Sequence, residues 1–317
     1  AYQNNNFKYV EPFSGLFTQG MVCHETYKDE KGKWVGQDEI ELVDDKTFVK
    51  KISREKVTVG PSESMSKSKK NIINMQKKSF SMELAGKTLT AEFNDLTAHA
   101  NGSVMLRYGE TVILVTAVMS ARESAANYFP LSVEFEEKFY AAGQILGSRF
   151  QRREGRPSDE AVLSARIVDR TIRPLFNQKV RRDVQVVVTV LAVGEDDPDV
   201  LGVIGASLAL SVSDIPWAGP VGAIRIGRTK DTGDVVINPT YLERKEGVLD
   251  VEILACGKDG TINMIETSAH EVSEQEIIQM LQQAAGLHSE IEAFQKTIVT
   301  EIGKTKQQLE GPTVQPE

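Results

Sequence analysis

The sequence predicts an α+β fold, in which β-hairpins are mixed with helices. Three observations carry this prediction. Two hairpin patterns follow one another after Met75, a long apolar run covers Val184–Val193, and Ser158 stands before an amphipathic stretch as a helix-capping residue. Neighbouring antiparallel strands combined with separate helices are typical of the α+β class. The chain has 317 residues, which is enough for about two domains.

Residues 1–74 form the first predicted domain, and their pattern is fragmentary. Short apolar stretches separated by charged turns predict strands at Trp34–Val35, Ile40–Val43 and Phe48–Val49. The segment Gly60-Pro61-Ser62-Glu63-Ser64 has the composition of a turn or loop, and polar residues continue to Asn71. We therefore expect the boundary between the two domains just before Met75.

Residues 75–287 are predicted to form the second domain, which is rich in strands. Turns at Gly86-Lys87 and at Tyr108-Gly109-Glu110 each join two apolar stretches and predict two hairpins. The apolar run Val184–Val193 predicts a strand that is buried on both faces. The strands expected in this domain are Ser79–Ala85, Leu89–Phe93, Ser103–Arg107, Thr111–Met119, Leu131–Tyr140, Val184–Val193, Ala223–Ile226, Val235–Ile237, Leu249–Ala255 and Ile262–Glu266.

Helices are predicted at three places in the second domain. Ser158 and the acidic residues after it cap the first, whose apolar stripe comprises Val162, Leu163, Ile167, Val168 and Ile172. Asp199–Val212 is the second, and its inward face is expected to comprise Val203, Ile204, Leu208 and Val212. Ser273–Leu287 is the third, and an amphipathic helical pattern continues from about Glu290 to Leu309.

Composition is typical of a soluble globular protein, with 40% hydrophobic and 26% charged residues. No apolar run approaches the roughly 20 residues that span a bilayer, so we expect no membrane partner. Cys23 and Cys256 lie far apart without a Cys/His cluster, so neither a disulfide framework nor structural zinc is expected. Because Ala1–Asn6 shows no secretory signal, a reducing cytoplasm is the expected location.

A basic segment stands out in a chain whose net charge is −8. Residues 149–182 contain ten Lys and Arg against four Asp and Glu, a local net charge of +6. Guanidinium groups bind phosphate oxygens bidentately, and a phenylalanine ring can stack on a nucleobase. The alternative is a solvated surface loop, although such loops seldom combine so many arginines with so little lysine. The residues assigned here to RNA binding are Arg149, Phe150, Arg152, Arg153 and Arg156.

A second part of the basic segment lies on the first predicted helix. Arg166, Asp169, Arg170 and Arg173 follow the helical spacing i, i+3, i+4, i+7 and therefore share one face. Arg170 and Arg173 would extend the basic surface toward RNA. A purely structural network, in which Asp169 pairs with a neighbouring arginine, is supported about equally well.

Three weaker features complete the candidates. Met65-Ser66-Lys67-Ser68-Lys69 is a cluster of hydroxyl and ammonium groups that could surround a triphosphate, although this composition is more often a linker. His24 beside Glu25 lacks metal-ligand spacing and is expected to be structural. The carboxylates of Glu195-Asp196-Asp197 and Asp199 most simply cap the second helix, with a Mg²⁺ site as the less favoured alternative. No metal site is predicted.

From Met75 onward, the chain resembles the N-terminal part of the bacterial polynucleotide phosphorylase (polyribonucleotide nucleotidyltransferase) family. The resemblance implies a first RNase PH-like domain, a mixed β-sheet with helices, over residues 75–287. It also implies that residues 288–317 begin an all-α linker domain. The motifs that carry it, in consistent order, are Tyr128-Phe129-Pro130-Leu131, Tyr140-Ala141-Ala142-Gly143, Arg152-Arg153-Glu154-Gly155-Arg156-Pro157-Ser158, Ile172-Arg173-Pro174-Leu175-Phe176, Ile204-Gly205-Ala206-Ser207, Ile215-Pro216 and Gly219-Pro220-Val221-Gly222.

This resemblance implies an activity for the family and a restricted role for this chain. The family degrades RNA from its 3′ end, with phosphate as the nucleophile, and its full-length enzymes use Mg²⁺ and inorganic phosphate. Its chemistry resides in a second RNase PH-like domain, which is expected to be missing here. Pro198-Asp199 stands near the position of the serines that hold phosphate in that domain, and Asp250 resembles one of its metal aspartates without the usual companion. We therefore expect no phosphorolysis and no cofactor bound by this chain.

The same resemblance implies that the arginine-rich loop threads RNA. In the family, this loop projects into the central channel of a ring-shaped trimer and grips single-stranded RNA, and Arg152, Arg153 and Arg156 match it. The family has two phenylalanines before the arginines, whereas only Phe150 can be assigned here. The expected partners are single-stranded RNA and two further copies of the chain in a homotrimer.

Residues 9–71 resemble a different family, the leucyl-tRNA synthetases. The resemblance rests on Glu11-Pro12-Phe13, on Phe17-Thr18-Gln19-Gly20-Met21-Val22, on Glu25-Thr26-Tyr27 and on the block Met65 to Asn71, which is similar to the K-M-S-K-S loop. It implies that Met65, Ser66, Lys67 and Ser68 are the remnant of an ATP-binding loop, with Ser64 in place of its first lysine. The partner H-I-G-H motif is absent, so no leucine activation is expected. The join before Met75 could be a natural fusion, an artificial join or an error in the gene model.

Three functional hypotheses follow. The favoured one is a catalytically silent, RNA-binding part of a phosphorolytic 3′–5′ exoribonuclease that acts in mRNA degradation. The second is an active phosphorolytic subunit that pairs with a missing half in trans. The third is an ATP-binding module derived from leucyl-tRNA synthetase.

Overall fold

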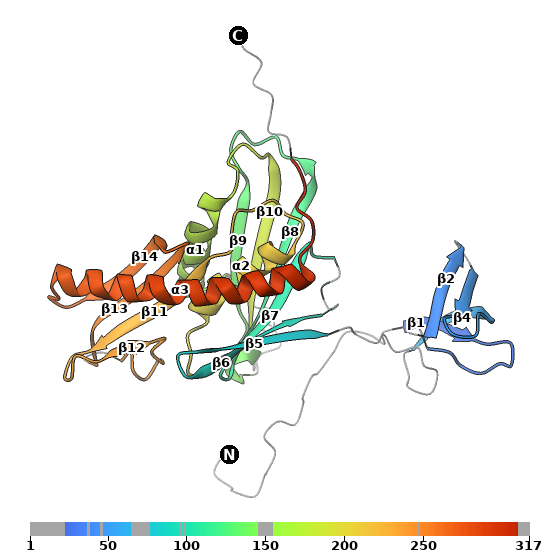
Figure 1. Ribbon diagram of the computed structural model, residues 1–317, viewed down its shortest axis with the longest axis horizontal. Helices are drawn as coiled ribbons and strands as arrows, with labels where there is room; N and C mark the ends of the chain where they lie inside the picture. The colour runs from blue at the N-terminus through green and yellow to red at the C-terminus, as the bar shows by residue number, and fades with distance from the viewer. Residues whose placement is uncertain are drawn as a thin grey trace, which may run out of the picture. The chain divides into compact units, whose positions relative to one another are not determined.

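The protein forms two compact units, residues 1–76 and residues 77–317, each of which is described by itself (Figure 1). The structure is a computed structural model. The residues that it describes are 23–36, 39–44, 47–64, 77–94, 97, 99–144, 155–245 and 248–309.

The first unit is a small antiparallel sheet. Its strands follow the order β1 (Cys23–Lys28), β4 (Lys56–Ser64), β3 (Thr47–Lys50) and β2 (Ile40–Asp44). The rings of Tyr27 and Phe48 pack 5.4 Å apart over Val35, Ile40 and Val57 and form its core. The predicted strands near Ile40 and Phe48 are present, whereas Trp34 forms only an isolated bridge with Lys28.

The assignment of residues 60–64 to a turn or loop was wrong, because they belong to β4, in which Ser62, Glu63 and Ser64 pair with β1. Proline removes a ladder donor and is tolerated where one side of a strand is unpaired. Strand β3 pairs with β4 only at Val57 and Lys56, so Pro61 lies beyond that pairing. The Pro61 carbonyl accepts a hydrogen bond of 3.1 Å from Thr26 Oγ1, which attaches this stretch to β1.

The second unit contains a six-stranded sheet with the order β5-β6-β7-β8-β10-β9. All neighbours are antiparallel except β9 and β10, which run parallel from Leu131 beside Val184 to Glu137 beside Val190. The first hairpin turns at Ala85-Gly86, one residue before the predicted position, and both residues have positive φ angles of 50° and 77°. The strands are β5 (Lys78–Leu84), β6 (Lys87–Phe93), β7 (Gly102–Tyr108), β8 (Thr111–Glu123), β9 (Leu131–Glu137) and β10 (Arg182–Ala192).

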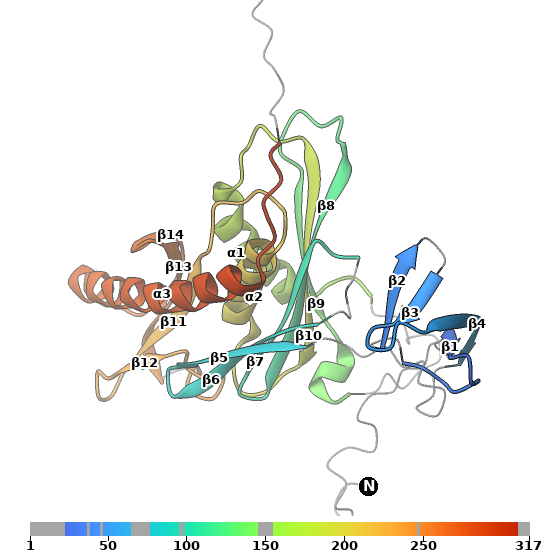
Figure 2. The same cartoon turned by 45° about the vertical axis from the view of Figure 1, so that its right-hand side comes forward.

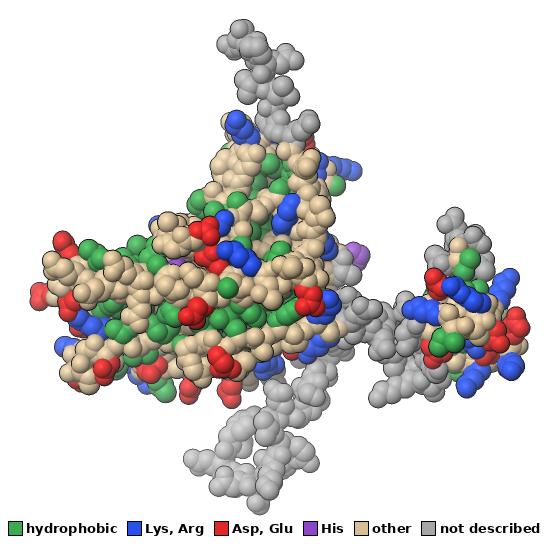
Figure 3. Space-filling model, in the orientation of Figure 1, with side chains coloured by type: hydrophobic (Ala, Val, Ile, Leu, Met, Phe, Trp, Pro, Cys, Tyr) green, Lys and Arg blue, Asp and Glu red, His purple; other side chains and the backbone are tan. Residues whose placement is uncertain are grey.

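A second, antiparallel sheet completes this unit. Its order is β12 (Val235–Ile237), β11 (Gly222–Thr229), β13 (Leu249–Lys258) and β14 (Thr261–Ala269). The long helix α3 (Glu274–Ile302) lies beside β11 and β13 in two views that differ by 45° (Figures 1 and 2). Hydrophobic side chains line the junction where α3 meets the strands beneath it (Figure 3).

Helices α1 (Asp159–Ile172) and α2 (Pro198–Val212) cover one face of the six-stranded sheet. Ser158 caps α1 as the sequence predicted, with its Oγ accepting a hydrogen bond from the Ala161 N–H at 3.0 Å. Helix α2 contacts β7 and β8 on one side and β11 and α3 on the other. It is therefore buried all round, rather than on the single face that the sequence analysis assigned to it.

Two burial predictions were wrong, because helices cover only one face of the large sheet and the sheet in turn covers only one face of α1. Along β10, Val184, Val186, Val188 and Val190 are buried, but the alternate residues are exposed or half-buried. On α1, Val162 and Leu163 are 46% and 52% exposed. The buried face of α1 instead comprises Ala161, Ser164, Ile167, Val168, Thr171 and Ile172.

The C-terminal end of the unit differs from the two expected helices. Helix α3 is continuous and ends at Ile302, and residues 303–309, here called the C-terminal strap, are not helical. The Lys306 ammonium donates hydrogen bonds to the carbonyls of Leu210, Ser211 and Ser213 at 2.7, 3.0 and 2.8 Å. These carbonyls lie at the end of α2, where helical partners are missing. Burial lowers the pKa of Lys306 to about 8.

Candidate functional site

The parallel pair β9 and β10 positions a candidate site. Ligands in sheets with parallel strands commonly bind beyond the carboxyl ends of those strands. Strand β9 ends at Glu137, where the predicted strand to Tyr140 gives way to a single 3-10 turn, η3 (Phe139–Ala142). The amino ends of α1 and α2 lie on the same side, because Ser158 and Pro198 line the same cleft.

This cleft, here called the β9 cleft, has a volume of about 700 Å³, which is within the range of small-molecule sites. Exposed aromatic rings stand at its walls, since Phe139 is 45% and Tyr241 is 44% exposed. A second hollow of about 400 Å³ continues along β9 and α1 to Arg173. The residues that line the β9 cleft are Glu134–Phe139, Ala141, Ala142, Gly155–Ser158, Ala161, Val190, Val193, Pro198 and Tyr241.

The acidic residues that line the β9 cleft all belong to β9. Glu137 Oε2 accepts a hydrogen bond of 2.7 Å from Ser158 Oγ, which links the strand to the start of α1. Glu136 pairs with Lys138 at 2.8 Å, and Glu134 accepts from Gln185 Nε2 at 2.9 Å. Arg156 adds a guanidinium group. Side chains alternate between the two faces of a strand, so Glu137 shares the helix-covered face with buried Phe135, and Glu134 and Glu136 lie on the other face. The β9 cleft therefore offers the Glu137 carboxylate together with the Arg156 guanidinium group.

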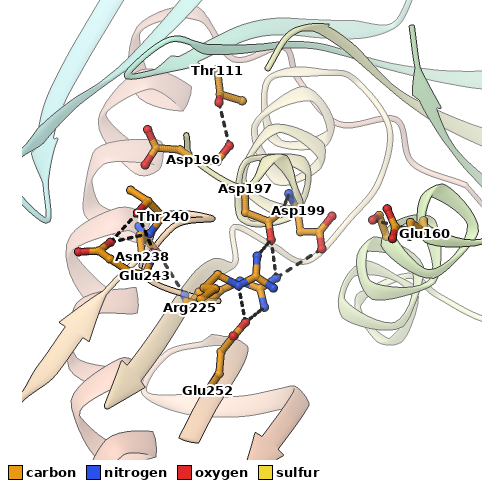
Figure 4. Close-up of polar contacts among 12 residues, drawn as sticks. Thr111, Glu160, Asp196, Asp197, Asp199, Arg225, Asn238, Thr240, Glu243 and Glu252 are labelled. Atoms are coloured by element: carbon orange, nitrogen blue, oxygen red, sulfur yellow. Dashed lines mark hydrogen bonds and ion pairs between the residues drawn. The ribbon is translucent and has the colours of Figure 1, made fainter. Parts of the chain in front are cut away.

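A buried ion-pair network lies at the start of α2 (Figure 4). Arg225, which is 6% exposed, pairs with Asp197 at 3.1 Å, with Asp199 at 3.4 Å and with Glu252 at 2.5 Å. Arg244 contacts Asp197 and pairs with Glu252 at 2.8 Å through Nε. Two guanidinium groups thus face three carboxylates, which leaves no unpaired cation in the network.

The excess of carboxylates changes how nearby groups titrate. Burial and the neighbouring Asp197 carboxylate raise the pKa of Asp199 to about 6, and together they outweigh the attraction of Arg225 and Arg244. Burial and the carboxylates of Asp197 and Asp199 also raise the pKa of Tyr241 above its usual 10.0. The Tyr241 backbone N–H donates to the Glu195 carbonyl at 2.9 Å, which ties the wall of the β9 cleft to the start of α2.

Asp250, which the family resemblance compared with a metal ligand, is bound by an arginine. Asp250 is held by Arg228, with contacts of 3.0 and 2.5 Å, and the hydrogen bond from Arg228 lowers the Asp250 pKa. Asp197 instead caps α2 by accepting from the Asp199 N–H at 2.9 Å, as the sequence analysis expected of this acidic cluster. Within the part of the chain that the structure describes, no group of three His, Cys, Asp or Glu residues could hold a metal ion.

Comparisons with known proteins place this geometry in a family. Residues 85–216 match the family model described as 3′ exoribonuclease family, domain 1, and residues 219–286 match domain 2 of the same family. Together these matches cover more than half of the chain. The chain belongs to the 3′ exoribonuclease family. Both matches fall inside the single unit formed by residues 77–317.

Relatives in the 3′ exoribonuclease family are longer than this chain. The polyribonucleotide nucleotidyltransferase of Exiguobacterium sibiricum is 44% identical over 235 residues, which cover 74% of this chain and 31% of that protein. The enzymes of the same name from Heliobacterium modesticaldum and Thermomicrobium roseum are 44% and 46% identical, over 33% and 29% of their lengths. The chain therefore spans about a third of the curated relatives that it matches.

A solved structure supports the fold. The crystal structure of rice (Oryza sativa) Rrp46 aligns with a TM-score of 0.51 and 16% identity over 71% of this chain and 94% of that chain. Among the described helices, none is long and apolar enough to cross a membrane.

The arginine-rich segment of residues 149–156 is only partly described. Arg149, Phe150, Arg152 and Arg153 lie outside the described residues, as do Met65, Ser66, Lys67 and Ser68 of the predicted ATP-loop remnant. Arg156 is exposed and lines the β9 cleft.

The arginines of α1 divide into two groups. Arg170 is exposed in the last turn of the helix. Arg173 forms hydrogen bonds of 3.0 and 2.6 Å to Asp169 and one of 3.1 Å to the Leu131 carbonyl. The predicted pairing of Asp169 with a neighbouring arginine is therefore present, and Arg173 anchors the start of β9.

Sequence reasoning missed the buried network and the aromatic wall. Asp197, Arg225, Arg244 and Glu252 are distant in sequence, so no spacing rule connects them. One signal was available, because Arg225 interrupts the apolar run from Ala223 to Ile226. A charged residue inside a buried strand requires partners of opposite charge.

Proposed function

We propose that this chain is the RNA-binding N-terminal part of a polyribonucleotide nucleotidyltransferase, a phosphate-dependent 3′–5′ exoribonuclease that acts in mRNA degradation. The observation that carries the proposal is the 40–46% identity to enzymes of that name over about a third of their length. In this proposal, residues 75–287 are the first RNase PH-like domain and residues 288–317 begin the helical linker domain.

The proposal includes that the chain performs no phosphorolysis by itself. Phosphate binding needs cations that are not already neutralised, because a phosphate dianion is repelled by carboxylates. Arg225 and Arg244 are both held by carboxylates, and Asp199 adds a further acidic group at the start of α2. This arrangement supports a silent site, while Mg²⁺ and inorganic phosphate would serve a second RNase PH-like domain in the complete enzyme.

The arginine-rich segment is proposed to grip single-stranded RNA in a cytoplasmic homotrimer. The residues are Arg149, Phe150, Arg152, Arg153 and Arg156, with Arg170 and Arg173 extending the surface. The exposure of Arg156 and Arg170 supports this role. Because Arg173 is held by Asp169, its contribution would be to position the β9 end of the surface.

The test replaces Arg152, Arg153 and Arg156 together by alanine. Affinity for single-stranded RNA should fall similarly for all base compositions, because contacts to phosphate carry no sequence information. If three phosphate contacts are lost, the slope of log affinity against log salt should decrease by about 2. Fluorescence anisotropy with a labelled U12 oligonucleotide at several salt concentrations measures both quantities. The oligomeric state is measured in the same samples by light scattering.

A matched control removes three cations from elsewhere in the chain, the exposed residues Arg107, Arg122 and Lys179, and so changes the net charge equally. The control should retain most of the affinity and of the salt slope. Equal losses in the two triple variants would show that only net charge matters and would contradict the proposal. The same preparations should release no nucleoside diphosphates from poly(A) in the presence of phosphate. Release that is abolished by Arg225→Ala would contradict the proposal that this chain performs no phosphorolysis.

Residues 1–74 are proposed to derive from a leucyl-tRNA synthetase and to have no part in leucine activation. The support is the order of the motifs from Glu11 to Asn71, which includes the block Met65-Ser66-Lys67-Ser68. A leucine-dependent pyrophosphate-exchange assay should give no signal above a protein-free control, and robust exchange would overturn this assignment.

A further inference from the structure

We propose that the β9 cleft binds a guanine base. This inference rests on the proposed RNA-binding function and adds a base preference to a surface whose arginines recognise only phosphate. It is carried by the combination of exposed rings, a carboxylate and a guanidinium group at the carboxyl ends of β9 and β10.

The volume and the rings fit a nucleotide. A volume of about 700 Å³ lies within the range of small-molecule clefts. Phe139 and Tyr241 come from separate segments, η3 and the loop after β12, and both rings are nearly half exposed. Base–aromatic stacking needs such exposed rings and favours no particular base. The rings therefore explain binding of a base but not its identity.

A carboxylate can select which base is bound. Along its Watson–Crick edge, guanine presents two adjacent N–H donors, at N1 and N2, which match the two oxygens of one carboxylate. Adenine, cytosine and uracil each place an acceptor on that edge, and this acceptor would face a carboxylate lone pair. Glu137 is the best placed of the three glutamates, because its bond with Ser158 fixes the side chain at the amino end of α1. Its oxygens have about four lone-pair sites, so accepting from Ser158 leaves the others for a base.

A single cation is available to hold the phosphate. Arg156 lines the β9 cleft as part of the proposed RNA-gripping segment, whereas Lys138 is already paired with Glu136 at 2.8 Å. A guanidinium group beside an aromatic-lined cleft suits a nucleoside monophosphate unit, whose base and phosphate require different partners. An RNA strand that passes Arg156 would thus deliver one base to the β9 cleft.

The experiment titrates the full chain with GMP, AMP, CMP and UMP by isothermal titration calorimetry. GMP should bind about tenfold more tightly than each of the others, which is the discrimination typical of one good bidentate pair. Glu137→Gln should abolish this preference, because the amide replaces one acceptor by a donor while it can still accept from Ser158. Glu123→Gln, the same change on an exposed strand residue outside the β9 cleft, should leave the preference intact.

Phe139→Ala provides a second variant, and it should weaken binding of all four nucleotides by a similar factor, because stacking favours no particular base. Equal affinity for the four nucleotides in the wild-type chain would overturn the inference, as would a GMP preference that survives Glu137→Gln. Binding of U12 separates this result from the proposed function. If U12 binds but GMP has no advantage, the guanine site is wrong and the RNA-binding proposal stands. If GMP is preferred but U12 does not bind, the guanine site is supported and the RNA-binding proposal fails.

Discussion

Replacing Asp199 by asparagine should stabilise the second unit above pH 7 and have little effect near pH 4. Asp199 lies at the start of the buried helix α2, next to Asp197, with a side chain that is 17% exposed. Burial and the Asp197 carboxylate raise its pKa from 3.8 to about 6. Asparagine imitates the protonated acid, since it has nearly the same shape and carries no charge.

The size of the stability change follows from the pKa shift of Asp199. A rise from 3.8 to about 6 corresponds to about 3 kcal/mol against the ionised form, at 1.36 kcal/mol per pKa unit. Between these two values the folded protein binds more protons than the unfolded chain, so the contribution of Asp199 to stability decreases as the pH rises. The stability advantage of the variant should therefore grow by up to about 3 kcal/mol between pH 4 and pH 7.

Urea titrations monitored by tryptophan fluorescence measure this difference. Trp217 is buried in the second unit and donates a hydrogen bond to the Ile172 carbonyl at 3.1 Å, so its emission reports on this unit. A Trp34→Phe background removes the other tryptophan, which lies in the first unit. The quantity compared is the free energy of unfolding of the variant minus that of the parent, at pH values from 4.5 to 8.

Asp214→Asn is the control, and its effect on the free energy of unfolding should have the opposite sign. Burial alone would raise the Asp214 pKa, but hydrogen bonds from Gln307 and Asn101 outweigh it and lower the pKa. A lowered carboxyl pKa stabilises the fold above the unfolded value, and this stabilisation is lost as the pH falls through the folded value. The control variant should therefore lose stability most at neutral pH. A pH-independent difference for Asp199→Asn, or one with the sign of the control, would refute the reasoning.

Three further substitutions test the second unit. Burial lowers the pKa of His288 below its usual 6.5, so stability should fall as the pH drops below 6.5; His288→Gln should make this fall smaller in urea titrations, and equal falls would contradict the assignment. Gly102→Ala should cost about 1–3 kcal/mol, because a Cβ would lie 2.1 Å from the Ala209 carbonyl oxygen of α2. Gly286→Ala in α3, where nothing lies within 4 Å, should instead leave stability unchanged or raise it by up to about 1 kcal/mol, and similar losses at both glycines would contradict the packing argument.

The sequence predicted where helices and strands begin and end better than it predicted which of their faces are buried. Ser158 followed by acidic residues marked the start of α1, because capping depends on neighbouring residues alone. The burial of α2 on every side could not be read from its own residues, because it depends on a second sheet formed after residue 221. Likewise, the exposure of Val162 follows from which face of α1 the sheet covers.

In the candidate site too, features within one segment were predictable, whereas contacts between distant segments were not. The arginine-rich segment was visible from composition, and Arg156 does line the β9 cleft. The role of Arg173 was left open between RNA contact and structure, because spacing alone cannot show which carboxylate or carbonyl a side chain meets. The carboxylates that neutralise Arg225 come from α2 and β13, so only the tertiary fold brings them together.

The C-terminal strap determines how the second unit responds to mechanical force. Because Lys306 and the backbone N–H groups of Lys304 and Gln307 bond to the end of α2 and the residues after it, tension applied at residue 309 acts there first. The surface helix α3 is loaded only after these bonds rupture. A pull on this end of the chain is therefore taken up by the helix at the centre of the unit.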